Sequence, residues 1–452
     1  MRRLITLVCY LGIIGLLQGL ARYLVRNRTG IRYELMNLGN WPVVYGLIFC
    51  AVAFLFGLPD LQETLARTIV LSILSCAASA TVFSIINTIW GPSLLPRYLT
   101  VAAPFAIAPW LILCGLLSRR GWNREAAKER VLVIASGSEI EQVRREMTGR
   151  PERPCVFVGS VEMSRLTSNP ERRATFGQAL YVCEPGKVLE EAGLHQASLL
   201  VLSEEAQRFP QVVKEAAQLH ESGTRVRSLT AFYDEWLGKL PISELDRMQL
   251  MFDLSDVHPT VYARLKRTVD VIAAVAILAV LALLLPFILI GNLIGNRGPL
   301  FFRQRRIGQY GEEFDILKFR SMTPNASGQG EWTIVGDARI SSFGGLLRRT
   351  HLDELPQAMN ILKGEISLIG PRPEQVHYVR QLEQSIPHYG FRHTVRPGIT
   401  GWAQVKYPYG ASVRDAEEKL EYDLHYLRHH SLFTDLRITS RTLRGIFFKS
   451  GR

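Results

Sequence analysis

Cysteine is scarce in this chain and absent from its last third. The six cysteines include no CxxC pair, which argues against a disulfide framework and against a cysteine-rich zinc site. There is no zinc-finger spacing and no stretch in which basic and aromatic residues alternate, so nucleic acid is not an expected partner. The histidines include no HExxH motif, and we interpret them as structural rather than metal-binding.

Charge is spread unevenly along the 452 residues. Hydrophobic residues make up 47% and charged residues 21%, which is too apolar for a disordered chain and too charged for a polytopic transporter. The net charge of +12 comes from the first and last parts of the chain, whereas residues 129–256 are acidic. The basic excess therefore lies in the parts that contain long apolar runs, which indicates anionic lipid or phosphate partners.

Four uncharged runs open the chain and predict a four-helix transmembrane region over residues 1–120. A bilayer core of about 30 Å requires about 20 apolar residues per helix, and each run is long enough. An alternative is that one run lies along the interface. Basic residues before the first run and after the last place both ends in the cytoplasm, although the arginines within 22–32 oppose this orientation. The runs are Leu4–Ala21, Leu35–Pro59, Thr68–Pro96 and Tyr98–Ser118.

Residues 121–256 have the pattern of a cytosolic α/β domain. Strands are expected at Val131–Ala135 and Ser198–Leu202, each followed by a helical stretch, and this alternation is typical of a Rossmann-like parallel sheet. The first turn lacks GxGxxG, which argues against dinucleotide binding. We expect a structural or regulatory domain, which together with the N-terminal helices offers surfaces for a homodimer.

A fifth apolar run, Val271–Asn296, contains no charged residue. Basic residues flank it on both sides, whereas a spanning helix normally has a basic excess on one side. Pro286 removes an amide donor from the middle of the run and predicts a sharp bend, the membrane break. We therefore predict a re-entrant helix that returns to the cytoplasmic face, with a Pro-kinked spanning helix as the alternative.

The densest group of polar residues surrounds Asp353 and Glu354. Pro356 fits a helix only in its first turn, which predicts a helix start near Asp353. The positive end of a helix favours an ionised, nucleophilic Asp353 and a nearby phosphate. Because adjacent carboxylates point in different directions, one could attack while the other holds a metal. Taken alone, the same residues also fit an ordinary helix cap.

Cations in short motifs lie on both sides of this acidic pair. Arginine is suited to bidentate phosphate contacts, and loops rich in glycine and proline hold a side chain rigidly. For each cation taken singly, a solvated or headgroup contact is the alternative. Together with two carboxylates and a membrane-dipping segment, they indicate phosphoryl transfer at a lipid surface. The candidate phosphate-binding residues are Lys318, Arg320, Arg339, Arg372 and Arg396.

Five motifs follow one another in the C-terminal part: FFRQ at 301–304, KFRSM at 318–322, LDELPQ at 352–357, LKGEISLIGPRP at 362–373 and RPGITGWAQV at 396–405. In this order they resemble the bacterial sugar transferase family, the polyprenyl-phosphate hexose-1-phosphate transferases. The resemblance covers residues from about 262 to 449. The apolar runs and the α/β domain upstream resemble the large members, which act on galactose or glucose.

The resemblance implies an α-rich monotopic catalytic domain over residues 257–452, anchored by a re-entrant helix at the cytoplasmic face of the bacterial inner membrane. The implied reaction moves a sugar-1-phosphate from a nucleotide diphosphate sugar, with UDP as the expected nucleotide, to undecaprenyl phosphate. This step would initiate O-antigen, capsule or exopolysaccharide synthesis.

The resemblance also implies roles for particular residues. Asp353 matches the nucleophile that forms an aspartyl phospho-sugar intermediate, and Glu354 matches its partner, which is associated with Mg²⁺. Lys318 and Arg372 match phosphate-contacting cations. Many members carry Ser-Pro at the membrane break, where this chain has Leu-Pro at 285–286. Two alternatives stay open: a glycosyltransferase that moves the sugar alone, and a catalytically inert membrane scaffold or regulator.

Overall fold

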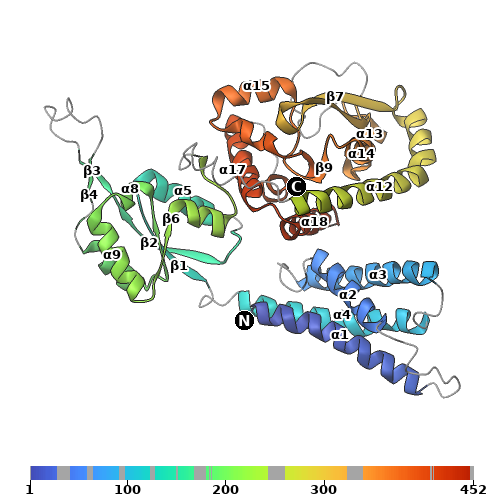
Figure 1. Cartoon of the computed structure of the whole chain (residues 1–452), viewed down its shortest axis with the longest axis horizontal. Coiled ribbons are helices and arrows are strands. Elements are labelled where there is room, and N and C mark those ends of the chain that lie inside the picture. The colour runs from blue at the N-terminus through green and yellow to red at the C-terminus, as the bar shows by residue number, and fades with distance from the viewer. Residues whose placement is uncertain are drawn as a thin grey trace. The chain divides into compact units, whose positions relative to one another are not determined.

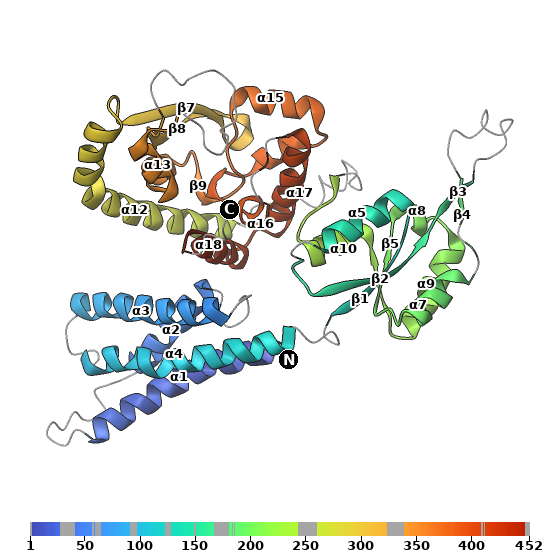
Figure 2. The same cartoon turned by 180° about the vertical axis from the view of Figure 1, so that it is seen from behind.

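The structure, a computed structural model of the chain, divides into two compact units (Figures 1 and 2). The first comprises Met1–Lys128 with Thr439–Arg452, and the second comprises Glu129–Ile438. The structure describes residues 2–27, 41–56, 58, 65–90, 97–122, 128–148, 151–166, 180–182, 184, 186–242, 260–322, 339–407, 410 and 412–447.

The first unit contains one helix for each of the four expected runs: α1 (Arg2–Asn27), α2 (Trp41–Leu55), α3 (Leu65–Trp90) and α4 (Arg97–Trp122). Within α1, α3 and α4, the segments Thr6–Tyr23, Thr68–Ile86 and Thr100–Leu117 are long and apolar enough to cross a bilayer. α2 has 15 residues, or about 22 Å at 1.5 Å per residue. In the described residues it is therefore shorter than a spanning helix, contrary to the expectation for the second run.

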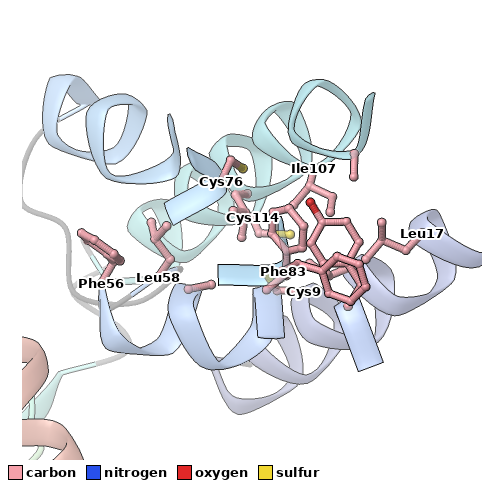
Figure 3. Packing of buried hydrophobic residues seen from close by; sticks show 14 of the residues in the cluster. Cys9, Leu17, Phe56, Leu58, Cys76, Phe83, Ile107 and Cys114 are labelled. Atoms are coloured by element: carbon pink, nitrogen blue, oxygen red, sulfur yellow. The ribbon is translucent and has the colours of Figure 1, made fainter. Parts of the chain in front are cut away.

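These four helices share a buried apolar core (Figure 3). The rings of Tyr45 and Phe83 lie 4.3 Å apart between centroids, so they join α2 to α3. The indole nitrogen of Trp110 in α4 donates to the carbonyl oxygen of Cys9 in α1 at 3.0 Å. The side chains of Cys9 and Cys76 are buried inside this core.

A parallel sheet in the order β2-β1-β5-β6 opens the second unit. Its residues alternate between two apolar clusters, one on each face. Val131, Val133 and Leu199 pack with α5 (Gly137–Met147) and α10 (Leu229–Phe232) on one face. Leu132 and Leu200 pack with α7 (Lys187–Leu194) and α9 (Pro210–Glu221) on the other. The alternation explains why the predicted strands are continuous apolar runs. The predicted parallel sheet is confirmed, whereas the Rossmann-like assignment stays a prediction.

The elements of this part are β1 (Glu129–Ala135), α5 (Gly137–Met147), β2 (Cys155–Glu162), β3 (Ser164–Leu166), β4 (Leu180–Val182), α7 (Lys187–Leu194), β5 (Leu199–Leu202), α8 (Glu204–Gln207), α9 (Pro210–Glu221), β6 (Arg225–Ser228), α10 (Leu229–Phe232) and the π-helix η3 (Tyr233–Leu237). The short strands β3 and β4 form a separate antiparallel pair.

The rest of the second unit is rich in helices, and the last of them, α18, begins in this unit and ends among the residues of the first. Its elements are α12 (Thr260–Gly295), β7 (Phe301–Ile307), η5 (Gln309–Gly311), β8 (Glu313–Phe319), α13 (Ser342–Arg349), η7 (Leu352–Gln357), α14 (Ala358–Lys363), β9 (Ser367–Ile369), α15 (Val376–Ser385), η8 (Tyr389–Thr394), β10 (Gly398–Thr400), α16 (Trp402–Lys406), α17 (Val413–His429) and α18 (Leu432–Phe447). β7 and β8 form an antiparallel hairpin, and β9 pairs with β10 in parallel.

α12 contains the fifth apolar run and has Pro286 inside it. Both views show its ribbon turning sharply before it reaches β7 (Figures 1 and 2). Ala274, before the proline, packs with residues of α14 such as Ile361. Ile288, after the proline, packs with Phe319 of β8 and a leucine of α13. Both halves of the helix therefore pack against the same domain.

Candidate active site

Asp353 and Glu354 lie in η7, directly after a reversal of the chain. α13 ends at Arg349, and His351 then adopts a left-handed conformation with φ of 56°, which is uncommon for a residue other than glycine. The chain continues as a 3₁₀ turn that contains Pro356 and leads into α14. The predicted helix start near Asp353 is therefore confirmed, although its first turn is 3₁₀ rather than α.

Glu354 is held by two of the predicted cations. The ammonium of Lys318, from β8, donates to Oε1 of Glu354 at 3.0 Å, and a guanidinium nitrogen of Arg372 lies 3.8 Å from the same oxygen. Burial alone would raise the pKa of Glu354, but the two cations outweigh it and hold the pKa at about 2. Glu354 is therefore ionised at neutral pH, and the structure brings together Glu354, Lys318 and Arg372 as predicted.

Asp353 has a different environment from its neighbour. Its side chain is buried, with 9% exposed, and within the described residues its carboxylate makes no hydrogen bond or ion pair. Burial, followed by the charge of Glu354, raises the pKa of Asp353 even though Lys318 and Arg348 oppose the shift. Burial therefore opposes the ionisation of Asp353 that the helix N-terminus favours. A desolvated, unpaired carboxylate has both oxygens available for attack on an electrophile.

Arg372 is positioned by residues that the sequence did not single out. Its guanidinium donates to the side-chain oxygen of Gln404 at 3.3 Å. Its carbonyl oxygen accepts a hydrogen bond from Arg392 at 3.0 Å, and Arg392 forms a buried ion pair with Asp423 at 2.8 Å. Gln404 lies in the motif at 396–405, but Arg392 and Asp423 lie in none of the five motifs, and the contacts join separate segments.

The loops that carry Arg372 and Arg396 run in close contact. A Cβ added to Gly370 would lie 2.3 Å from the carbonyl oxygen of Arg396, and one added to Gly398 would lie 2.1 Å from the amide nitrogen of Gly370. A side chain at either position would force the two backbones apart. Gly370, in the motif at 362–373, and Gly398, in the motif at 396–405, thus allow β9 and β10 to pair and fix the loop of Arg372.

The other three predicted cations lie elsewhere. Arg320 follows β8, and its buried guanidinium donates to the carbonyl oxygens of Pro299 and Asn296. Its placement does not support a phosphate contact. Arg339 lies in a turn beside the Met322–Ile340 bridge, and Arg396 is exposed. Their phosphate contacts stay predictions.

Comparison with known proteins identifies the family. The bacterial sugar transferase profile matches residues 261–449. The exopolysaccharide production protein PSS of Rhizobium leguminosarum bv. phaseoli is 36% identical over 187 residues, which make up 40% of this chain and 93% of that protein. The chain belongs to the bacterial sugar transferase family. Asp353, Glu354, Lys318 and Arg372 all lie within the matched region.

Two further relatives have names that state a reaction. The UDP-N-acetylgalactosamine-undecaprenyl-phosphate N-acetylgalactosaminephosphotransferase of Aeromonas hydrophila is 40% identical over 210 residues, 46% of this chain and 49% of that protein. The UDP-glucose:undecaprenyl-phosphate glucose-1-phosphate transferase of Xanthomonas campestris pv. campestris is 42% identical over 172 residues, 37% of this chain and 35% of that protein. The matches thus span about half or less of these relatives. Family membership and the apolar helices identify this chain as an integral membrane protein.

The acidic pair fits a magnesium ion by its donor atoms. Magnesium prefers oxygen ligands and is usually bound through one or two carboxylates plus substrate phosphates. Lys318 and Arg372 both contact Oε1 of Glu354, which leaves the other oxygen of that carboxylate to bind an ion. The unpaired carboxylate of Asp353 adds oxygen donors beside it.

Proposed function

We propose that this transferase moves a sugar-1-phosphate from a UDP-sugar to undecaprenyl phosphate and so initiates a lipid-linked polysaccharide. The observation that carries the proposal is the contrast within the acidic pair: Asp353 is desolvated and unpaired, while Glu354 is fixed by Lys318 and Arg372. Relatives named as undecaprenyl-phosphate sugar phosphotransferases support the reaction class.

The proposed chemistry consists of two displacements at one phosphorus atom. A carboxylate oxygen of Asp353 attacks the phosphorus that carries the sugar, and the bond from this phosphorus to the bridging oxygen breaks, so that UMP leaves with the electron pair. The resulting aspartyl phospho-sugar is then attacked by a phosphate oxygen of the lipid acceptor. This second step returns the carboxylate and yields the lipid-linked diphosphate sugar.

The cations have defined tasks in this scheme. Lys318 and Arg372 hold Glu354 in place and present positive charge where the anionic phosphates enter. Magnesium, held by the second oxygen of Glu354, would offset the charge of the diphosphate when bound. Arg339 and Arg396 are proposed as further phosphate contacts.

Identification of the released nucleotide tests the proposed reaction. A purified preparation incubated with undecaprenyl phosphate, Mg²⁺ and a panel of UDP-sugars is expected to release UMP with one or few of the sugars. Release of UDP would instead support a glycosyltransferase that moves the sugar alone. Absence of any release across the panel, in a folded preparation, would support the inert scaffold.

The ends of α12 support a re-entrant arrangement at the cytoplasmic face of the inner membrane. A straight helix of 36 residues would be about 54 Å long, yet both ends bind one domain. Near the start, Arg267 donates to the carbonyl oxygens of Ile361 and Leu362 at 2.5 and 2.7 Å. At the end, Asn296 donates to the carbonyl oxygen of Arg320 at 2.5 Å. We propose that the bend near Pro286 is the deepest point of the anchor.

Cysteine accessibility distinguishes a re-entrant from a spanning α12. Arg264 and Arg297 flank the apolar run and are exposed. In a background without native cysteines, we expect Arg264→Cys and Arg297→Cys to react with an impermeant maleimide in inverted vesicles and not in intact cells. Glu221→Cys, on α9, is the matched cytosolic control. Labelling of one of the two positions only from the periplasmic side would rule out the re-entrant arrangement.

The pH dependence of the first displacement is expected to report the ionisation of Asp353. Its pKa is raised by burial and by the charge of Glu354, so the reactive carboxylate form is lost at a higher pH than for an ordinary aspartate, whose pKa is about 3.9. The rate of UMP release should therefore fall as pH drops through the raised value. Glu354→Gln removes the neighbouring charge and should shift this acid limb to lower pH. Burst-phase pH–rate profiles of both proteins measure the shift, and an unmoved limb would contradict it.

A further inference from the structure

A second polar cluster joins the α/β domain to the catalytic domain, away from the acidic pair. Asp234 lies in η3, and His425 and His429 lie on α17. Nδ1 of His425 is 2.7 Å from Oδ1 of Asp234, and Nε2 of His429 is 2.8 Å from the same oxygen and 2.9 Å from Oδ2. Two imidazole nitrogens from one domain therefore converge on one carboxylate from the other.

The two histidines are four residues apart, which places them on one face of α17. Their ring centroids are 4.7 Å apart. The absence of an HExxH motif favours structural histidines, and the third member of this cluster, Asp234, comes from a distant segment that such a motif does not include. The three ligand atoms all lie within 4.8 Å of one another.

We propose that Asp234, His425 and His429 bind a divalent transition metal of the zinc type and that the ion links the two domains. Two imidazoles and one carboxylate are a ligand set that zinc uses, with metal–ligand distances of about 2.0–2.2 Å. In a tetrahedral site such ligand atoms lie roughly 3.3 Å apart, so the ion enters after a slight opening of the cluster. Arg428 lies 3.8 Å from Oδ2 of Asp234, farther from that oxygen than His429 at 2.9 Å.

The partial exposure of the His429 side chain gives the ion a path from solvent and leaves one coordination position open to water. His425 is largely buried, whereas the side chain of His429 is 45% exposed. An ion can therefore reach the cluster from solvent on the side of His429, and water completes its coordination there.

The ion would strengthen an interface that is already polar and specific. The ring of His425 stacks on Trp402, with centroids 5.6 Å apart, and the indole nitrogen of Trp402 donates to the carbonyl oxygen of Gly238 at 2.7 Å. Lys239, 3% exposed, pairs with Glu146 of the α/β domain and Glu421 of α17. Trp402 belongs to the same motif as Arg396, so the ion would fix the α/β domain against a loop that leads to the active site.

Zinc binding by the full-length protein in detergent tests the site. After dialysis against a chelator, Zn²⁺ is titrated in excess Mg²⁺, so that oxygen-ligand sites stay occupied by magnesium. We expect about one equivalent of Zn²⁺ per chain by elemental analysis, an increase in unfolding temperature, and the intense visible absorption of a tetrahedral site when Co²⁺ replaces Zn²⁺.

Variants distinguish a metal site from a hydrogen-bonded cluster. His429→Ala changes a partly exposed residue, and Asp234→Asn keeps the size of the side chain, so both should fold. Each is expected to weaken Zn²⁺ binding on the order of 100-fold and to abolish the zinc-dependent rise in unfolding temperature. His220→Ala, an exposed histidine on α9, should bind zinc like the parent. Failure of the parent to bind, or equal binding by all variants, would overturn the proposal.

Discussion

Replacement of Asp353 by asparagine is expected to reduce turnover by a factor on the order of 10⁴ or more, while the protein stays folded. An amide cannot form the proposed covalent intermediate, and loss of an enzymatic nucleophile commonly removes most of the rate enhancement. The buried carboxylate makes no hydrogen bond or ion pair among the described residues, so its replacement breaks no contact that stabilises the fold. The measurement is UMP release per minute together with the thermal unfolding midpoint.

Two controls make this result specific to Asp353. Asp315→Asn changes an exposed carboxylate on β8 and should retain parental turnover. The parent, incubated with a UDP-sugar but no lipid acceptor, should release about one equivalent of UMP and carry an acid-labile sugar phosphate on Asp353. Turnover near the parental level in Asp353→Asn, or an adduct on another residue, would refute the assignment of the nucleophile.

Local sequence patterns were sufficient to predict part of this site. The motifs named Glu354, Lys318 and Arg372, and these three side chains lie together. The apolar strands of the α/β domain were predictable because a sheet covered on both faces requires continuous apolar runs. The motifs and the type of each element can be recognised within one segment, because they depend on short-range sequence patterns.

The other features of the site depend on contacts between segments that are far apart in the sequence, and no local pattern predicts such contacts. Arg320 was expected to contact a phosphate, but its buried guanidinium donates to backbone carbonyl oxygens. The sequence indicates the helix start that favours an ionised Asp353, whereas the burial that raises its pKa follows only from the fold. The cluster of Asp234 with His425 brings together segments almost two hundred residues apart. Such features become visible only when the chain is folded.

Replacement of Arg392 by methionine is expected to destabilise the catalytic domain by about 3–5 kcal/mol, because it leaves Asp423 buried without its cation. The pair is enclosed: the side chains of Arg392 and Asp423 are 6% and 2% exposed, and their charged atoms lie 2.8 Å apart. The unfolding midpoint of the purified protein should fall by several degrees. Activity should also fall, because the carbonyl oxygen of Arg372 loses the hydrogen bond from Arg392.

The double variant Arg392→Met/Asp423→Leu separates these two effects. Replacement of both members of a buried ion pair by apolar residues is often neutral or stabilising, so the unfolding midpoint should return close to that of the parent. UMP release should stay impaired, because methionine cannot donate to the carbonyl oxygen of Arg372 and the loop that presents this arginine to Glu354 is no longer held. Full recovery of both stability and turnover would mean that Arg392 serves the fold alone. Recovery of stability without turnover would establish it as a positioning residue for the active site.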